Sequence, residues 1–390
     1  MLIAAPLFLC VCADKKYLEC FLKVWSNPFI FRSFCTLLFL IGFATLFPLI
    51  FMTEDFSLVI LLITQVVHFV CATFFFAFLD YHKIPFNELC DAFINIFVLQ
   101  TIIECVAFTN QSTVGAFVRH FNRFEADKLS GPGSNVRGFA LSAATTYHLS
   151  LIYGVAFIIY IKRIIETNIT VWKIIKGLFI FVGIFFAGRT GFVGVGIACL
   201  YFLFTLKCPA RKKVKAIFKV GVIVAIIITA FLSFAPKKIR GMVVNSLIPY
   251  AFEAIYSKLD SGKAQTASTN QLKDMWNRDF NEMELVRGSG RYMDLTGEHY
   301  YMRVDPGVLR HLLYGGIIFY AVLIFYQLLM SFPFTKRRDY YIFILCFAYF
   351  FVMDFKGVTI GLNKFAFVSS LLFGYSYTKN YTEFPKCLTH

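Results

Sequence analysis

The stretch SLVILLITQVVHFVCATFFFAFL at residues 57–79 decides the fold class of this chain. It holds no Asp, Glu, Lys or Arg, and about 20 consecutive apolar residues are what an α-helix needs to cross the hydrocarbon core of a bilayer. Comparable runs recur along the chain. They predict transmembrane helices near residues 33–52, 57–79, 87–108, 138–161, 217–235, 308–331, 340–354 and 358–377.

A longer apolar region, residues 170–206, carries Arg189 near its middle and basic residues at both ends. Because basic flanks favour the same side of the membrane, this region predicts a tight hairpin of two helices. Residues 1–13 are also apolar and form either a short first span or a signal-like segment. We therefore expect one all-α polytopic membrane domain over residues 1–390, with about 11 transmembrane helices, or one fewer if residues 1–13 do not cross.

The composition supports this class. Of the 390 residues, 58% are apolar, 18% aromatic and 16% charged, whereas roughly a quarter of a soluble domain is charged. These values exclude a cytosolic enzyme, a secreted disulfide scaffold and a disordered protein. The formal charge of +15 comes from short basic blocks between apolar runs, so it is a topology signal and predicts no nucleic-acid partner. Nearly all of the 11 Cys lie within or beside apolar runs and none forms a C-x-x-C pair, so we expect neither a disulfide framework nor a metal site.

The basic residues also predict which loops face the cytoplasm. The assignment places just over half of the 38 Lys and Arg side chains inside, together with the C-terminus. Most of the others lie in two enlarged outer loops, residues 109–137 and 236–307, and long loops are translocated largely regardless of charge. The segments assigned to the cytoplasm are 14–32, 80–86, 162–176, 207–219, 332–339 and the C-terminal tail.

Apolar residues at helical spacing predict two amphipathic helices within loop 236–307, lying at the membrane interface. Residues 286–307 differ, because they have no helical period and are rich in Gly, Arg, acidic and aromatic residues. The first helix would carry Val244, Ile248, Phe252, Ile255 and Leu259, and the second Leu272, Met275, Trp276 and Met283.

Three groups of polar residues are candidates for chemistry, and the first is Gly188-Arg189-Thr190-Gly191 at the outer tip of the predicted hairpin. A guanidinium recessed below the membrane surface is costly unless it faces a polar cavity or an anion. Arg189 is therefore either a phosphate-binding residue or a turn residue whose side chain extends to the lipid headgroups.

The second group lies between residues 287 and 310. Arginine presents a planar fork that suits phosphate oxygens, while carboxylates and His exchange a proton with a hydroxyl. The alternative is a loop of mutually paired charges, which is favoured for any single member but not for the cluster as a whole. Arg310 is the strongest candidate, because it lies just inside an apolar helix. The members are Arg287, Arg291, Asp294, Glu298, His299, Arg303, Asp305 and Arg310.

The third group lies in loop 109–137, where a substrate clamp and a solvated surface are both reasonable interpretations. Its members are Arg119, Arg123, Glu125, Asp127, Lys128 and Arg137. Interfacial anchoring accounts for the charged residues near the outer ends of other spans, which are Glu104, Asp354, Lys356 and Lys364. Walker A, H-E-x-x-H and G-x-S-x-G motifs are absent from the sequence, which disfavours ATP hydrolysis and proteolysis.

Three segments resemble the O-antigen polymerase (Wzy) family of bacterial surface-polysaccharide assembly. They are Gly188-Arg189-Thr190-Gly191, Gly288-Ser-Gly-Arg-Tyr292, and Asp305-Pro-Gly-Val-Leu-Arg310 followed by Tyr314-Gly-Gly-Ile317. The many spans and the two enlarged periplasmic loops are similar as well. The related O-antigen ligases carry His at roughly the place of Asp305, so this chain resembles the polymerases more than the ligases.

The resemblance implies a metal-independent membrane glycosyltransferase with a GT-C-like helical fold and no cofactor. It would lie in the bacterial inner membrane, with its active site facing the periplasm. Its substrates would be oligosaccharide repeat units on undecaprenyl pyrophosphate, and its partners membrane lipids and a chain-length regulator. The growing glycan would pass from its lipid carrier to a new lipid-linked unit, giving O-antigen lipopolysaccharide or a capsule.

The resemblance also implies roles for individual residues. Arginines would bind the pyrophosphate, an acid or His would orient or deprotonate the acceptor hydroxyl, and tyrosines would stack on sugar rings. The residues given catalytic roles are Asp305, Arg310, Arg189, His299 and Glu298. Those given substrate-binding roles are Arg291, Arg287, Arg137, Arg303, Tyr292, Tyr300 and Tyr301.

Three other functions fit the sequence. An O-antigen ligase, or another lipid-linked glycosyltransferase, would use similar donors with a different acceptor. A flippase of lipid-linked oligosaccharide, which is not an enzyme, predicts charges distributed along several helices, whereas here they gather in outer loops and at helix ends. A non-catalytic assembly scaffold is the third alternative.

Overall fold

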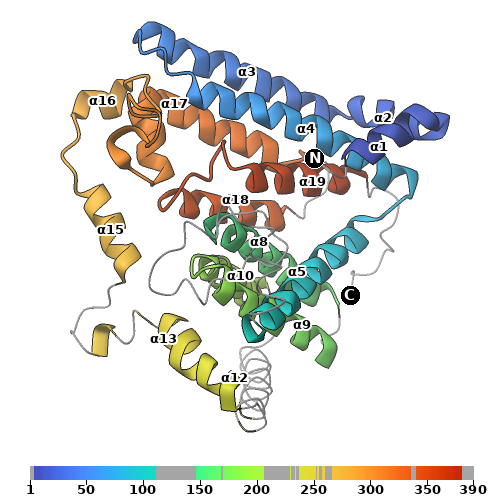
Figure 1. The fold of residues 1–390 in the computed structure, drawn as a ribbon. Helices are drawn as coiled ribbons and strands as arrows, with labels where there is room; N and C mark the ends of the chain where they lie inside the picture. The colour runs from blue at the N-terminus through green and yellow to red at the C-terminus, as the bar shows by residue number, and fades with distance from the viewer. Residues whose placement is uncertain are drawn as a thin grey trace. The chain divides into compact units, whose positions relative to one another are not determined.

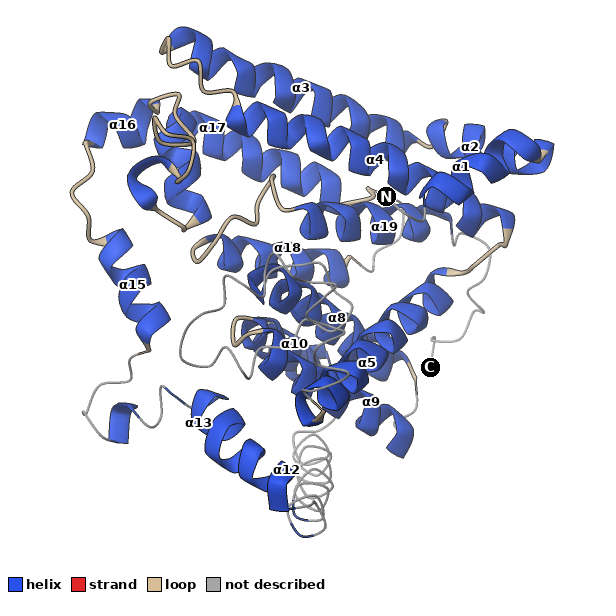
Figure 2. Cartoon of the chain, in the orientation of Figure 1, coloured by secondary structure: helices blue, strands red, loops and turns tan. Residues whose placement is uncertain are grey.

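The structure, a computed structural model, describes residues 4–110, 146–167, 170–205, 237–251, 266–334 and 340–379, with residues 229, 233, 253 and 257–259. Within these ranges the chain forms helices and connecting loops and no strand (Figure 2). Five of the helices are long and apolar enough to cross a membrane, which makes this an all-helical polytopic membrane protein. They are α3 (Pro28–Ile50), α4 (Ser57–Tyr81), α5 (Phe86–Thr109), α8 (Thr146–Glu166) and α17 (Gly307–Ser331).

The chain divides into two compact units. The first unit consists of residues 1–89 and 272–390, and the second unit of residues 90–271. Most of the predicted loop 109–137, including Arg137, and most of the predicted span 217–235 lie outside the described residues.

In the first unit, α3 and α4 pack against each other and against α17 and α19 (Lys364–Lys379) (Figure 1). α18 (Tyr341–Asp354) packs against α17. The contacts are largely aromatic: the ring centroids of Phe47 and Phe319 are 5.3 Å apart, and those of Phe69 and Phe367 are 6.3 Å apart. Because lipid is as apolar as these side chains, close packing between the helices, rather than exclusion of water, holds them together.

The N-terminal segment forms two short helices, α1 (Ala4–Ala13) and α2 (Lys15–Trp25). α1 has 10 residues and is about 15 Å long, so this helix alone is too short to cross a hydrocarbon core of about 30 Å. α2 was not predicted, because its basic residues placed it in a cytoplasmic loop. It is amphipathic, buries Tyr17 and Val24, and packs on α4.

The last helix, α19, begins later than the apolar pattern predicts, because residues 355–363 are not helical. Polar side chains stabilise this backbone inside the first unit. Asp354 Oδ1 accepts hydrogen bonds from the N–H groups of Thr359 (2.7 Å) and Ile360 (3.0 Å). The side chain of Asn363 then accepts from Phe365 N at 2.9 Å, at the start of α19. Such backbone is tolerated at membrane depth only where protein or water satisfies it.

In the second unit, α8 packs against α9 (Val171–Ala187) and α10 (Gly191–Thr205). α9 ends at Ala187 and α10 begins at Gly191, which confirms the predicted hairpin over residues 170–206. Small residues allow close approach here, since a Cβ on Gly194 would lie 2.6 Å from Gly154 Cα.

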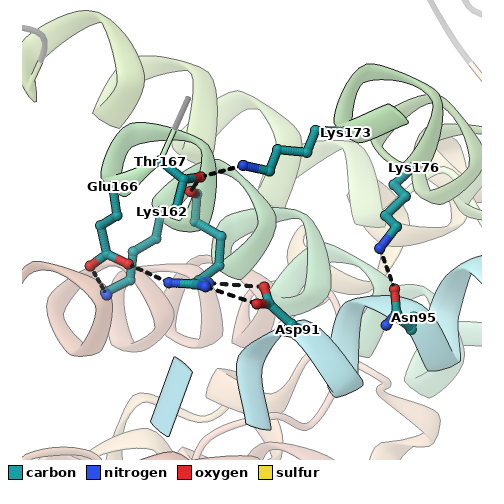
Figure 3. A network of polar contacts seen from close by, with 8 residues as sticks. Asp91, Asn95, Lys162, Glu166, Thr167, Lys173 and Lys176 are labelled. Atoms are coloured by element: carbon teal, nitrogen blue, oxygen red, sulfur yellow. Dashed lines mark hydrogen bonds and ion pairs between the residues drawn. The ribbon is translucent and has the colours of Figure 1, made fainter. Parts of the chain in front are cut away.

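A polar network joins the start of α5, the end of α8 and the start of α9 (Figure 3). Arg163 forms two hydrogen bonds with Asp91, at 2.8 and 2.9 Å, and Lys176 donates to Asn95 at 2.7 Å. Lys173 donates to Thr167 at 2.8 Å. Basic residues that flank the hairpin on its N-terminal side are therefore fixed by polar partners on α5 and at the end of α8.

The described residues of loop 236–307 are helical in both of the predicted places, while Phe252 and Ile255 of the first predicted helix lie outside the described residues. α12 (Lys237–Met242), a π-helical turn (Val243–Leu247) and α13 (Ile248–Ala251) form the first. The predicted second helix is two helices, α15 (Ala267–Trp276) and α16 (Glu282–Arg287), because Asn281 accepts a hydrogen bond from Met283 N and starts a new helix.

Candidate functional site

The candidate site lies in the first unit, at the N-terminal turn of α17. Arg310 is 7% exposed there, although its guanidinium is charged at any physiological pH. Its Cζ atom lies 3.3 Å from the ring centroid of Tyr300 and 4.2 Å from that of Tyr292. Nε and Nη2 are buried without a hydrogen-bond partner, and no ion pair joins Arg310 to a carboxylate of the described residues. A guanidinium in this state is suited to receive an anion.

A break in α17 lets backbone carbonyls near Arg310 bond to another segment of the chain. Gly316 has φ 69° and ψ −168°, so the helix is interrupted there. The interruption frees the carbonyls of Leu313 and Tyr314, which would otherwise bond residues further along the helix. They accept hydrogen bonds from Ser289 N (2.7 Å) and Gly290 N (2.8 Å) instead.

The glycines of this region allow two backbones to meet. A Cβ on Gly288 would lie 2.5 Å from both Gly315 Cα and Tyr314 O, and a Cβ on Gly316 would lie 2.2 Å from Val286 O. No larger residue fits either position without displacing backbone. The segments Gly288-Ser-Gly-Arg-Tyr292 and Tyr314-Gly-Gly-Ile317 are therefore in contact, and this contact places the tyrosine rings over Arg310.

The loop that follows α3 fixes the other side of the same segment. Asp55 Oδ2 accepts hydrogen bonds from Tyr292 N (2.5 Å) and Met293 N (2.7 Å), and the Thr53 hydroxyl donates to Gly290 O at 2.7 Å. Burial raises the pKa of Asp55, but hydrogen bonds from Met293, Ser57 and Tyr292 outweigh it, so the pKa lies below its ordinary value of 3.8. Asp55 therefore acts as a charged anchor for the backbone at Tyr292.

Apolar packing attaches α16 and the residues before α17 to the site. Val304, Leu309 and Leu313 form a small core, which Trp276, Phe280 and Leu285 among others cover. The Trp276 indole N–H donates to Phe355 O at 3.3 Å, and Arg278 donates to the carbonyl of Met302. The segment that carries Tyr300 is thus held on both flanks, while the Tyr300 side chain itself is 41% exposed.

The predicted residues divide into three sets. Arg310, Tyr292 and Tyr300 come together, and the Tyr301 hydroxyl donates to Glu284 at 3.4 Å. Arg291 is half-buried, with its backbone N–H bonded to the Ser289 hydroxyl at 3.3 Å. The remaining described members of the loop are exposed around this site and none forms an ion pair within the described residues: Arg287, Glu298, His299, Arg303 and Asp305.

Arg189 belongs to the second unit, at the tip between α9 and α10. Its Nη1 lies 2.6 Å from Glu253 Oε2. The tip is fixed by Ser150 of α8, which donates to Gly188 O at 2.5 Å and accepts from Gly191 N at 2.6 Å. That Arg189 and Arg310 both bind the pyrophosphate stays a prediction, since the two residues lie in different units.

Several polar residues at the site were not among the residues selected from the sequence. His311 and Asp354 are both fully buried, and His311 Nε2 lies 3.8 Å from Asp354 Oδ1. The Tyr320 ring stacks on His311 at a centroid distance of 5.9 Å. Asp354 was assigned to interfacial anchoring because it ends an apolar helix, but it faces inward.

Among the described residues, no group of three His, Cys, Asp or Glu side chains is arranged to hold a metal ion. Comparison of the chain with protein-family models, with curated proteins and with solved structures finds no match.

Proposed function

We propose that this chain is a membrane glycosyltransferase that polymerises oligosaccharide repeat units carried on a lipid pyrophosphate. The observation that carries the proposal is Arg310, a buried guanidinium with unpaired N–H groups at the start of a membrane helix, covered by two tyrosine rings. The resemblance of its surroundings to O-antigen polymerases supplies the reaction class.

The charge of Arg310 favours an anionic ligand. An unpaired charge in a buried site is costly, and the nearest helix terminus is the positive end of α17, so both contributions attract negative charge. A lipid pyrophosphate delivers such an anion to the end of a membrane helix. Its leaving group gains negative charge as the glycosidic bond is made, which is the stage at which a fixed arginine contributes most.

The tyrosines favour a sugar beside the anion. The Tyr300 side chain is 41% exposed, whereas that of Tyr292 beside it is 3% exposed, so Tyr300 offers aromatic surface to a ligand and Tyr292 is buried behind it. In the proposed reaction the acceptor hydroxyl oxygen bonds to the anomeric carbon of the donor while the bond from that carbon to the pyrophosphate oxygen breaks. Asp305, Glu298 and His299 are the exposed groups available to accept the hydroxyl proton.

In this proposal the site faces the periplasm of a bacterial inner membrane, where undecaprenyl-pyrophosphate-linked units and a chain-length regulator are found. Arg291 and Arg189 are secondary candidates for the pyrophosphate, with Arg287 and Arg303 at the rim. GT-C-like describes the helical fold that we expect for such an enzyme.

The test is a deletion strain complemented with the wild type, Arg310→Ala or Arg310→Lys. We expect both variants to lose long-chain polysaccharide, because Lys keeps the charge but not the planar fork. A gel of surface glycolipid should then show core carrying a single repeat unit, with variant protein at wild-type level in the membrane. Normal long chains from Arg310→Ala would refute the proposal, and uncapped core with polymer retained on the lipid carrier would identify a ligase instead.

A further inference from the structure

A second polar group lies directly beside Arg310 in the first unit. His311 and Asp354 are 0% exposed, with His311 Nε2 3.8 Å from Asp354 Oδ1. The Tyr320 hydroxyl interacts with the Asp354 carboxylate, and both ring nitrogens of His311 are buried without a close hydrogen-bond partner among the described residues. A buried polar group without a close partner is costly, so a buried His–Asp pair beside a buried arginine requires an explanation beyond packing.

The charges of the group suggest what it does. Arg310 acts electrostatically on both His311 and Asp354, although it forms an ion pair with neither. With His311 neutral and Asp354 ionised, the three side chains carry no net charge. An anion that enters this buried site adds at least one negative charge, and a low-dielectric environment makes such an excess costly.

We propose that His311 and Asp354 form a proton-binding site that takes up one proton when Arg310 binds a phosphate-like anion. The proton comes from solvent, is held by the pair of His311 Nε2 and Asp354 Oδ1, and returns to solvent when the anion leaves. No bond forms or breaks other than the N–H or O–H bond that holds this proton. The inference rests on the proposed function only in requiring that Arg310 binds an anion.

We assign the added proton to His311 and Asp354 after considering the other charged and titratable groups around them. α17 contributes Arg310 and Tyr320, and the segment before α17 contributes Tyr292, on which both Arg310 and Asp354 act electrostatically. The Tyr300 ring lies against the guanidinium, with its centroid 3.3 Å from Arg310 Cζ. Asp55, the carboxylate anchored below Tyr292, is already bonded by three backbone N–H groups.

A purely structural role for Asp354 is the alternative, because its Oδ1 accepts from Thr359 N and Ile360 N. Asp354→Asn separates the two roles. The amide oxygen can still accept both backbone hydrogen bonds, whereas the amide group cannot carry the negative charge that stabilises a protonated His311. His311→Gln is the matched second variant, since its amide nitrogen can occupy the place of Nε2 without titrating.

The experiment uses the purified full-length protein in detergent and sulfate as the probe. Sulfate is a tetrahedral dianion that does not titrate between about pH 5 and pH 8, where histidine changes charge, so any pH dependence belongs to the protein. Calorimetric titrations in two buffers of different ionisation enthalpy give the number of protons taken up. Arg310→Ala defines the binding that depends on this site.

For the wild type we expect uptake of up to one proton per sulfate, and an affinity that rises by up to about tenfold for each pH unit of acidification. Asp354→Asn and His311→Gln should bind sulfate with an affinity that is independent of pH and without proton uptake. Thermal unfolding shows which variants are folded, and either variant suffices for the comparison.

The outcomes separate this inference from the proposed function. Sulfate binding that depends on Arg310 but shows the same pH slope and proton count in the wild type and both variants would overturn the proton site and leave the anion site intact. Sulfate binding that is absent from the wild type, or equal in Arg310→Ala, would overturn the anion site and with it the basis of both proposals.

Discussion

The guanidinium carbon of Arg310 lies 3.3 Å from the centre of the Tyr300 ring. A buried charge is therefore in contact with a side chain of an exposed loop. Tyr292 lies at 4.2 Å and is 3% exposed, whereas Tyr300 is 41% exposed. One ring is therefore fixed in the interior by Asp55, and the other is accessible to a ligand. A cation over an aromatic face contributes from about 0.5 to 2 kcal/mol, more where it is desolvated. The two rings keep Arg310 in place, while its Nε and Nη2 atoms have no hydrogen-bond partner among the described residues.

The first prediction concerns Tyr300. Replacing it with Ala removes the accessible aromatic face, whereas Tyr300→Phe keeps the face and loses only the hydroxyl. Loss of about 1 kcal/mol of stacking corresponds to roughly fivefold weaker binding, so we expect Tyr300→Ala to shorten the glycan and Tyr300→Phe to leave it near normal. Glycolipid gels with immunoblots for protein level measure this. Equal defects in the two variants would instead assign the role to the hydroxyl.

The second prediction concerns the break in α17. Gly316→Ala combines a positive φ with a Cβ placed 2.2 Å from Val286 O, so we expect it to destabilise the first unit strongly, by about 3 kcal/mol or more. Thermal unfolding in detergent measures the effect, and the contact with residues 286–290 should be lost with it.

Two glycines serve as matched controls for that variant. Gly297 has nearly the same φ, 70°, but a Cβ there meets nothing within 4 Å, so Gly297→Ala isolates the backbone strain, about 1–2 kcal/mol. Gly42 lies in α3 with open space and no positive φ, so Gly42→Ala should be neutral or slightly stabilising. If Gly316→Ala proves no worse than Gly297→Ala, the close approach of the two backbones does not matter for stability.

The sequence predicts the features of the fold that local composition determines. Apolar runs located α3, α4 and α5 to within several residues, because a membrane span is set by local composition. The hairpin tip at Gly188-Arg189 was also predictable, since Arg and Gly interrupt an otherwise apolar run. Each of these features depends on neighbours along the chain.

The contacts of the site depend on residues that are far apart in the sequence. Nothing near Asp55 indicates that its carboxylate binds the backbone of Tyr292, 237 positions away. Asp354 likewise has the pattern of an interfacial residue until the turn after it folds inward and brings it to His311. Arg310 was identified because a charge inside an apolar helix is exceptional on its own, whereas the orientation of its tyrosines requires the tertiary contacts.

The third prediction concerns pH and Asp55. Its pKa is lowered in the folded protein, so its contribution to stability is fully present above the ordinary value of 3.8 and is lost as the pH falls through the lower folded value. We therefore expect Asp55→Asn to lower the unfolding temperature near neutral pH, because the amide cannot accept from Ser57 and Met293 with two oxygens. The difference between wild type and variant should shrink on acidification below that value.

Glu54→Gln is the control for that measurement, since Glu54 lies in the same loop with an exposed side chain for which the structure gives no hydrogen bond. Its unfolding temperature should follow the wild type at every pH. A gap between wild type and Asp55→Asn that stays constant down to the acidic end of the series would mean that the Asp55 charge does not hold the loop.

The fourth prediction concerns Arg189 and Glu253, whose side chains are 22% and 37% exposed and lie 2.6 Å apart. An exposed pair of this kind contributes at most about 1 kcal/mol, so Arg189→Ala should reduce stability only slightly. The proposed function adds that Arg189 assists in binding the pyrophosphate.

A charge reversal separates this role from the ion pair. In Arg189→Glu/Glu253→Arg the ion pair is re-formed, but the hairpin tip no longer carries the positive charge at residue 189. We expect this double variant to unfold near the wild-type temperature and to make only short glycan, while Glu253→Gln, which keeps Arg189, retains polymerisation. Long chains from the double variant would show that Arg189 acts only through its ion pair.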